Sequence, residues 1–260
     1  MRTLIAAIAL VSSVIAGSAQ QVAAPTVVAS VNATAERSGD LVRFTFEVVN
    51  SPSSPRPIMM FSVPYGSTIG VEDLEGPPGW LVNPAVGAAN LVGWTALSGA
   101  LLSPGQRAVG FAFTANGLPG IVDGFVVGLP SPKQIPRFPE GQAPESYQGL
   151  TVAELGTKMR VLGPVAPPET FRSPDFLRHL ASLLSEAGAL GWIDGSVLLT
   201  SLQAKILAAQ ASVERGNVRA AANQLAAVLN EVRAQSGKKL TTGAASLLQL
   251  NIEFALDRMR

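Results

Sequence analysis

The sequence predicts an α+β chain in two parts: an antiparallel β-sandwich followed by a small antiparallel α-helical bundle. In the first part, apolar residues recur at every second position of short segments, which is the pattern of strands with one buried face. In the second part they recur at every third or fourth position, as in amphipathic helices. A proline-rich stretch separates the two patterns. We therefore expect the sandwich in residues 20–163, a linker in 164–173 and the bundle in 174–260.

The N-terminus has the order of a cleavable secretory signal. Arg2 precedes an apolar run from Leu4 to Ile15, and small residues follow up to Ala19. Crossing a bilayer takes about 20 apolar residues, so this run is short for a membrane span and suits cleavage after Ala19. We expect residues 1–19 to be a signal peptide, the mature chain to be secreted or periplasmic, and no membrane span to remain after cleavage.

Cysteine usage and charge exclude several classes of function. The chain contains no cysteine, which rules out disulfides, a thiol nucleophile and thiolate metal sites. Lys and Arg number 19 against 18 Asp and Glu, and neither half of the mature chain carries a basic excess. Nucleic-acid binding requires clustered positive charge, so we expect no nucleic-acid partner.

The strand pattern is clearest in residues 41–50, where four apolar side chains alternate with polar ones. Gly- and Pro-rich turns separate this segment from others of the same style. A strand is predicted in each of 26–36, 41–50, 57–63, 90–97, 107–115, 124–129 and 157–163. Short strands at this spacing favour a sandwich.

Four helices follow the proline-rich linker, and each shows one apolar stripe. Side chains that cap a helix N-terminus, and glycines that suit a C-terminus, mark the ends. We expect the helices to run from Ser173, with Pro174 in the first turn, to Gly188 or Gly191; from Asp194 to Gly216; from Asn217 to Gly237; and from Thr241 or Thr242 onward. Short turns between them predict antiparallel neighbours.

The helical part carries a resemblance. The patterns WID at 192–194, LLTSLQAKILAAQ at 198–210 and ERGNVRAAANQLAAVLNEVRAQSGKKLTTGAASLL at 214–248 resemble the small module called FIMAH, which is appended C-terminally to many secreted bacterial proteins. The resemblance covers roughly residues 190–258. It implies a helical bundle in an extracellular context, with no established catalytic activity and no functional residues to transfer. Gly243 departs from the pattern, and we expect it to fray the last helix.

The first part resembles immunoglobulin-like domains in architecture, and this resemblance does not imply a function. Candidate catalytic residues are few. His179 is the only histidine, no G-x-S-x-G motif accompanies it, and we expect it at the surface or rim of the first helix. Glu72, Asp73 and Glu75 predict a solvated acidic loop rather than a calcium site.

Three aromatic residues of the first part could stack on sugar rings. Trp94 lies within a predicted strand, so we expect it in the core. Trp80, after a Pro-Pro-Gly turn, and Tyr147, in the proline-rich loop, remain the candidate ligand-binding residues. Lys238 and Lys239, a turn after Arg233, suit the negative end of a helix dipole.

The sequence therefore identifies no catalytic, cofactor-binding or metal-ligating residues. It favours an exported, non-catalytic module that binds a partner or serves a structural role in the bacterial envelope or extracellular space. The first alternative is a carbohydrate-binding or adhesive sandwich that uses Trp80 and Tyr147, so the partner could be a protein or a glycan. The second is a hydrolase whose carboxylate pair joins one of Glu72, Asp73 and Glu75 to Asp123 or Glu145.

Overall fold

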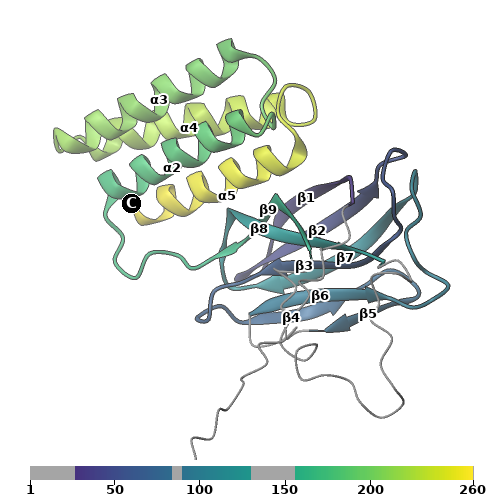
Figure 1. Cartoon of the computed structure of the whole chain (residues 1–260). Coiled ribbons are helices and arrows are strands. Elements are labelled where there is room, and N and C mark those ends of the chain that lie inside the picture. The colour runs from purple at the N-terminus through teal and green to yellow at the C-terminus, as the bar shows by residue number, and fades with distance from the viewer. Residues whose placement is uncertain (1–26, 84–89, 130–155, 260) are drawn as a thin grey trace, which may run out of the picture.

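The protein folds into a β-sandwich with a helical bundle packed along one of its edges (Figure 1). This computed structural model describes residues 27–83, 90–129 and 156–259. The expected fold class, a sandwich followed by antiparallel helices, is confirmed. The expected signal peptide lies outside the described residues. Among the residues that are described, no helix is long and apolar enough to cross a membrane.

Two antiparallel sheets form the sandwich. The first sheet has the order β1 (Ala29–Ser38), β2 (Leu41–Asn50), β7 (Arg107–Ala115), β4 (Val71–Glu75). The second has the order β5 (Trp80–Asn83), β6 (Leu91–Ala96), β3 (Ile58–Pro64), β8 (Leu118–Gly128), β9 (Thr157–Val165). β1 and β9 are edge strands of different sheets and contact each other. The side of the sandwich between these two edge strands is called the open side below.

The sandwich core is a cluster of aromatic rings from both sheets. The alternation in β2 buries Phe44 and Phe46, which stack on Phe113 of the neighbouring strand β7 at 5.4 and 5.8 Å. Trp94 of the second sheet is fully buried, as expected, and its ring stacks on Phe61 at 5.3 Å. The indole nitrogen donates to the Glu75 carbonyl oxygen at 2.7 Å. Its ring also stacks on Phe113 of the first sheet at 6.2 Å, so Trp94 joins the two sheets through its ring and its one polar atom.

The structure adds two strands that the pattern did not predict. β4 contains the acidic residues that we expected in a loop, and it pairs with β7 from Val71 to Glu75 across a bulge. β5 is only four residues long. β8 also begins at Leu118, earlier than the strand predicted at 124–129. Each error has the same reason: hydrogen bonds to a neighbouring strand hold short segments whose side chains do not alternate.

The helices are α2 (Ser173–Ala189), α3 (Ser196–Glu214), α4 (Val218–Gln235) and α5 (Thr242–Arg258). Two expected caps are confirmed: Asn217 accepts a hydrogen bond from the Ala220 amide, and Thr241 accepts one from the Ala244 amide. The expected glycine ends are confirmed by positive φ at Gly191, Gly216 and Gly237. α2 begins at Ser173 as expected, but Arg172 rather than Ser173 occupies the N-cap position, without a side-chain cap bond. The expected start of α3 was wrong, because the helix follows Gly195 rather than Asp194.

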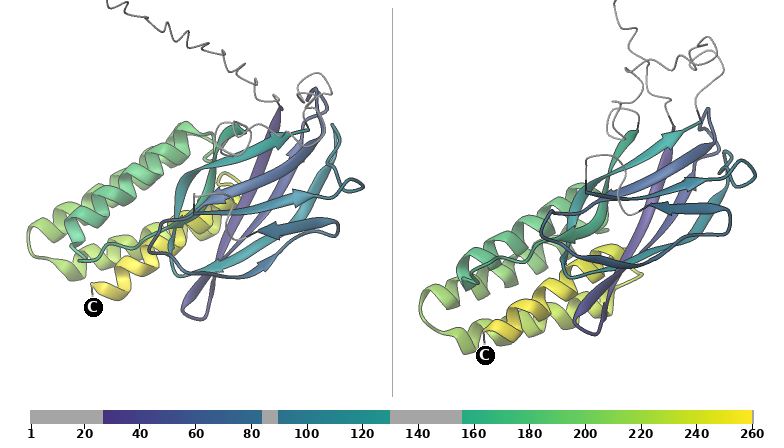
Figure 2. Two further views of the ribbon diagram at one scale, coloured as in Figure 1. Left: turned by 60° about the horizontal axis from the view of Figure 1, so that its bottom comes forward. Right: turned by 90° about the horizontal axis from the view of Figure 1, so that it is seen from below.

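Helix α5 fastens the bundle to the sandwich (Figures 1 and 2). It lies beside β1 and β8, over the open side between the two edge strands. The Ser246 hydroxyl accepts a hydrogen bond from the Ala35 amide at 3.1 Å, and the buried residues of sandwich and helices form one continuous apolar core. The strand–helix connection is short, since β9 reaches Val165 and α2 begins at Ser173.

Candidate functional site

A groove on the sandwich exists because β4 ends early. The ladder between β4 and β7 stops at the Glu75–Ala112 pair. Pro77 and Pro78 follow, and proline has no N–H to continue a ladder. The chain crosses here to the second sheet and resumes as β5. Within the described residues, the stretch of β7 from Arg107 to Gly110 therefore has β2 on one side and no strand on the other.

The backbone of this stretch directs hydrogen-bonding groups away from β2. The Asn50 amide donates to the Gln106 carbonyl oxygen at 2.9 Å, which places Gln106 among the residues that face β2. Facing alternates along an antiparallel strand, so Ala108 also faces β2. The N–H and C=O groups of Arg107 and Val109 consequently point away from β2, toward the side of β7 on which the groove lies. Gly110 follows as the bulged residue, with φ of 98°.

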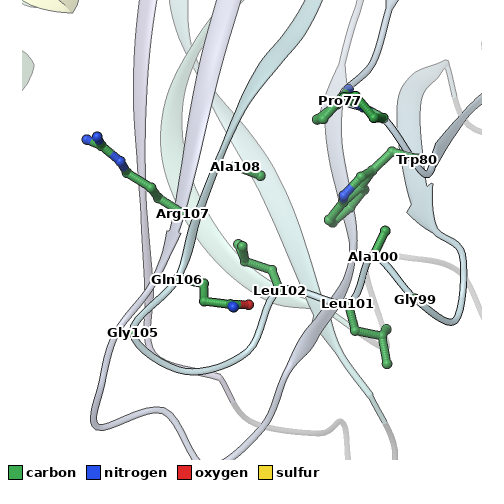
Figure 3. A pocket seen from close by; sticks show the side chains of 11 residues that line it. Pro77, Trp80, Gly99, Ala100, Leu101, Leu102, Gly105, Gln106, Arg107 and Ala108 are labelled. Carbon is green, nitrogen blue, oxygen red and sulfur yellow. The ribbon is translucent and has the colours of Figure 1, made fainter.

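The groove has a volume of about 640 Å³, and its walls come from both sheets (Figure 3). It is lined by Pro77, Pro78, Trp80, Gly99, Ala100, Leu101, Leu102, Gly105, Gln106, Arg107 and Ala108. One wall is tight: a Cβ on Gly79 would stand 2.6 Å from the Ala100 Cβ. Polar groups and aliphatic side chains share the lining surface about equally, with one cation and no carboxylate.

Trp80 contributes little ring surface to the groove. Its side chain is only 8% exposed, and its ring meets Phe111 edge-on, with centroids 5.0 Å apart and planes at 90°. Stacking on a sugar needs an open ring face. Trp80 is therefore a core residue that forms part of the groove wall. The second candidate, Tyr147, lies outside the described residues.

The polar groups of the groove are few. Arg107 is the only charged lining residue; its side chain is 75% exposed, and Nη1 lies 3.3 Å from a carboxylate oxygen of Glu47. Gln106 is held internally, because its Oε1 accepts a hydrogen bond from the Ser103 amide at 2.8 Å. The groove therefore offers a trough lined by both aliphatic side chains and polar groups, one exposed cation and the backbone groups of β7 that point away from β2.

The carboxylates considered for hydrolysis are not brought together in one place. Glu72 and Asp73 belong to β4 of the first sheet, where the Asp73 carboxylate accepts a hydrogen bond from Thr114. Asp123 belongs to β8 of the second sheet and binds Lys158 at 2.6 Å and Arg160 at 2.8 Å. Hydrogen bonds from these two cations hold the pKa of Asp123 below its ordinary value. Glu145 lies outside the described residues.

The remaining polar candidates occupy structural positions. His179 is exposed on α2, as expected, with its ring 6.3 Å from Phe176. Lys238 donates to the Ala234 carbonyl oxygen at 3.1 Å, at the C-terminal end of α4 where a cation is favourable. Arg233 pairs with Glu253 at 2.8 Å. Across the described parts of the chain, no three His, Cys, Asp or Glu side chains gather as a metal site would require.

The free edge of β7 was not predicted from the sequence. The strand at 107–115 was predicted, and the Pro-Pro-Gly turn before Trp80 was correctly predicted to interrupt the strands. The two prolines were the available signal, because a strand that ends at a double proline leaves the rest of its neighbour without a partner. The sequence pattern did not show that β7 is the strand beside β4.

No protein-family model matches the chain, and no curated protein sequence matches it. Two solved structures are similar over 53% of this chain. One is the full-length major pilin SpaD from Corynebacterium diphtheriae, at 10% identity and a TM-score of 0.30, and the similar region is 33% of that pilin. The other is an uncharacterized protein from Nocardia farcinica with an immunoglobulin-like fold, at 19% identity and a TM-score of 0.28, covered over 98% of its length. These scores carry no functional conclusion.

Proposed function

We propose that the protein is an exported, non-catalytic binding protein that accepts an extended segment of a partner polypeptide on the free edge of β7. One observation carries this proposal: the N–H and C=O groups of Arg107 and Val109 that point away from β2 have no strand partner among the described residues. An added strand satisfies such groups with its own backbone, and pockets beside the edge select its side chains.

The groove also defines the side chains that such a segment would carry. On an added strand, alternate residues point to opposite sides. One set enters the trough beside Ala108, near Trp80 and Leu102, and suits small or medium apolar side chains. The other set lies on the outer face, where an acidic residue opposite Arg107 is favourable. The preferred segment therefore alternates apolar and polar residues and includes a Glu or Asp.

Two further features support a binding role. Three of the described carboxylates weighed for catalysis are engaged within the fold. Glu75 pairs with Arg43 and Asp123 with Lys158, and the Asp73 carboxylate accepts a hydrogen bond from Thr114. The charge order of residues 1–19 supports export, and the resemblance of residues 190–258 to FIMAH modules supports a place outside the cytoplasm. Under this proposal the helical part is a module of that kind, fastened to the binding sandwich.

The test uses the mature chain, residues 20–260, and short synthetic peptides in which valine and threonine alternate, with or without one glutamate. Binding is followed by the shifts of backbone amide signals in nuclear magnetic resonance spectra. We expect the largest shifts at Arg107 and Val109, and tighter binding of the glutamate-containing peptides. Peptides that shift no signal in this stretch, or that bind only elsewhere, would overturn the proposal.

Two substitutions at one position separate backbone binding from side-chain binding. Val109→Pro removes the groove-facing N–H while leaving the hydrogen bonds to β2 in place, and Pro is tolerated on strand edges. Val109→Thr keeps the N–H and changes only the exposed side chain. We expect the proline variant to bind peptide at least about tenfold more weakly, since it loses a hydrogen bond and blocks the edge. The threonine variant serves as the matched control.

A further inference from the structure

A second cavity lies where the sandwich, the helices and the strand–helix connection meet. It has a volume of about 270 Å³ and is lined by Leu118, Val165, Ala166, Pro168, Thr170, Arg172, Asp175, Phe176, His179 and Asn251. These residues come from β8, β9, α2, α5 and the connection between β9 and α2. None of them lines the groove at Trp80, so the two sites are separate.

The surface that lines the cavity is mainly apolar. Phe176 is buried, and its ring packs against Phe171 at 5.5 Å and Phe254 at 5.2 Å. Leu118 and Val165 form the opposite wall from paired residues of β8 and β9. An apolar cavity of about 150 Å³ suffices to bind benzene. The larger volume here has room for a molecule with one or two rings.

One largely buried side chain gives this apolar lining a hydrogen-bond acceptor. Asn251 is 1% exposed, and its Nδ2 donates to the Pro119 carbonyl oxygen at 2.9 Å and to the Leu247 carbonyl oxygen at 2.8 Å. These two bonds fix the amide, and no described residue donates to its Oδ1. Because Asn251 lines the cavity, a ligand that supplies an N–H or O–H there can form a hydrogen bond with this acceptor.

The charged groups at the rim are matched with one another. Arg172 lies 3.7 Å from Asp175, and the same carboxylate accepts a hydrogen bond from Arg178 at 2.9 Å. All three side chains are largely exposed, so water already solvates them. The rim therefore does not require a charged ligand.

We infer that this cavity binds a small neutral molecule with one or two rings and a single hydrogen-bond donor. The rings lie between Leu118 and Phe176, and the donor binds Oδ1 of Asn251. Such a ligand contacts β8, α2 and α5 together, so its binding strengthens the attachment of the helical bundle to the sandwich. The inference is independent of the peptide site, since the two share no residue.

Indole and indene form a matched pair of probes, because they have nearly the same shape and only indole has an N–H. Each is titrated into the mature chain, residues 20–260, and the amide signals are followed by nuclear magnetic resonance. We expect indole to shift the side-chain amide of Asn251 and the backbone signals of Leu118 and Phe176. Indene should bind about tenfold more weakly, as expected for one lost hydrogen bond.

A filling substitution tests the location of the site. Ala166→Trp places a large side chain in the cavity from its exposed rim, and it should abolish the indole shifts while the circular dichroism spectrum is unchanged. Ala204→Trp, on the exposed face of α3, is the control and should bind indole as the unmodified chain does. Equal binding of indole and indene, retained binding by Ala166→Trp, or shifts confined to other residues would each overturn the inference.

Discussion

Gly243 of α5 lies directly against the backbone of Ala33 in β1: a Cβ on the glycine would stand 2.6 Å from the Ala33 carbonyl oxygen. The contact joins the helical bundle to the edge strand of the first sheet, and the hydrogen bond between Ser246 and Ala35 follows one turn later. The expectation that Gly243 frays the helix is therefore wrong. The residue is buried inside a capped helix, and it is small because a strand passes next to it.

Replacing this glycine tests how much the contact contributes. Alanine favours a helix interior by about 1 kcal/mol over glycine, so Gly243→Ala would stabilise an isolated α5. In the whole chain the new methyl group meets rigid backbone, and we expect the free energy of unfolding to fall by about 1–3 kcal/mol. Urea unfolding of the mature chain measures it.

Gly188→Ala is the matched control for this substitution. That glycine also lies in a helix, and its Cβ would meet the end of the Leu199 side chain at 2.8 Å. A flexible side chain can move aside, so the loss should be smaller than at Gly243. If Gly243→Ala proves as stable as the unmodified chain, the helix does not depend on close approach to β1.

The ion pairs around Arg160 give a prediction on pH. Arg160 binds Asp123 in the neighbouring strand and Glu186 in α2, and Asp123 also binds Lys158. The hydrogen bonds from Lys158 and, next, from Arg160 lower the pKa of Asp123 in the folded chain below the ordinary value of 3.8. A lowered folded pKa means stabilisation that is fully present above the unfolded value and is lost as the pH falls through the folded one.

Asp123→Asn should therefore destabilise the chain by about 1 kcal/mol at neutral pH, the upper range for partly exposed pairs. The difference from the unmodified chain should shrink as the pH falls below 3.8. Urea unfolding at neutral and acidic pH measures both. Asp40→Asn, in the exposed turn after β1, is the control and should change little at either pH. A loss of unfolding free energy in Asp123→Asn that is the same at neutral and acidic pH would contradict the lowered pKa of Asp123.

The sequence predicted those elements whose side chains repeat with a fixed period. In β2, Phe44 and Phe46 alternate with polar residues because one face meets the core. The stripe in α2, with Leu177 and Leu184 fully buried, follows the helical period for the same reason. Helix ends were predicted where a side chain or a glycine acts locally, as at Asn217.

The parts that were not predicted depend on contacts between distant segments. β4 is a strand because β7 pairs with it. The groove exists because the prolines that follow β4 leave part of β7 uncovered. The ring of Trp80 is buried because it packs against Phe111 of β7. The contact of Gly243 with Ala33 joins residues that no local pattern relates. Periodicity identifies which face is apolar, and it does not identify what covers that face.

Trp80 gives a test that separates a core residue from a sugar-stacking surface residue. Its ring packs on Phe111 and is 8% exposed, so Trp80→Ala should lower the free energy of unfolding by about 3–5 kcal/mol. The neighbouring Leu81 is 58% exposed, and Leu81→Ala should change it by less than about 0.5 kcal/mol. Chemical unfolding of both variants measures the contrast. Replacing a tryptophan that stacks on sugars at the surface would change the free energy of unfolding little. Equally small changes for Trp80→Ala and Leu81→Ala would therefore favour the carbohydrate hypothesis.

The shared core predicts that sandwich and helices unfold together. Helix α5 contributes its buried face to both parts, and the apolar cluster continues from the aromatic rings of the sandwich into the bundle. Trp192→Phe removes the only tryptophan of the helical part, so fluorescence then reports on Trp80 and Trp94 in the sandwich, while far-ultraviolet circular dichroism reports mainly on the helices.

In urea the two signals of this variant should change at the same midpoint, as expected for one cooperative unit. Adding Gly243→Ala weakens the contact at Ala33 and should move the midpoints of both signals together. Two separate transitions in the parent variant would mean that the bundle and the sandwich are independent units joined only by their connection. A transition that splits only after Gly243→Ala would instead locate the coupling at the contact between α5 and β1.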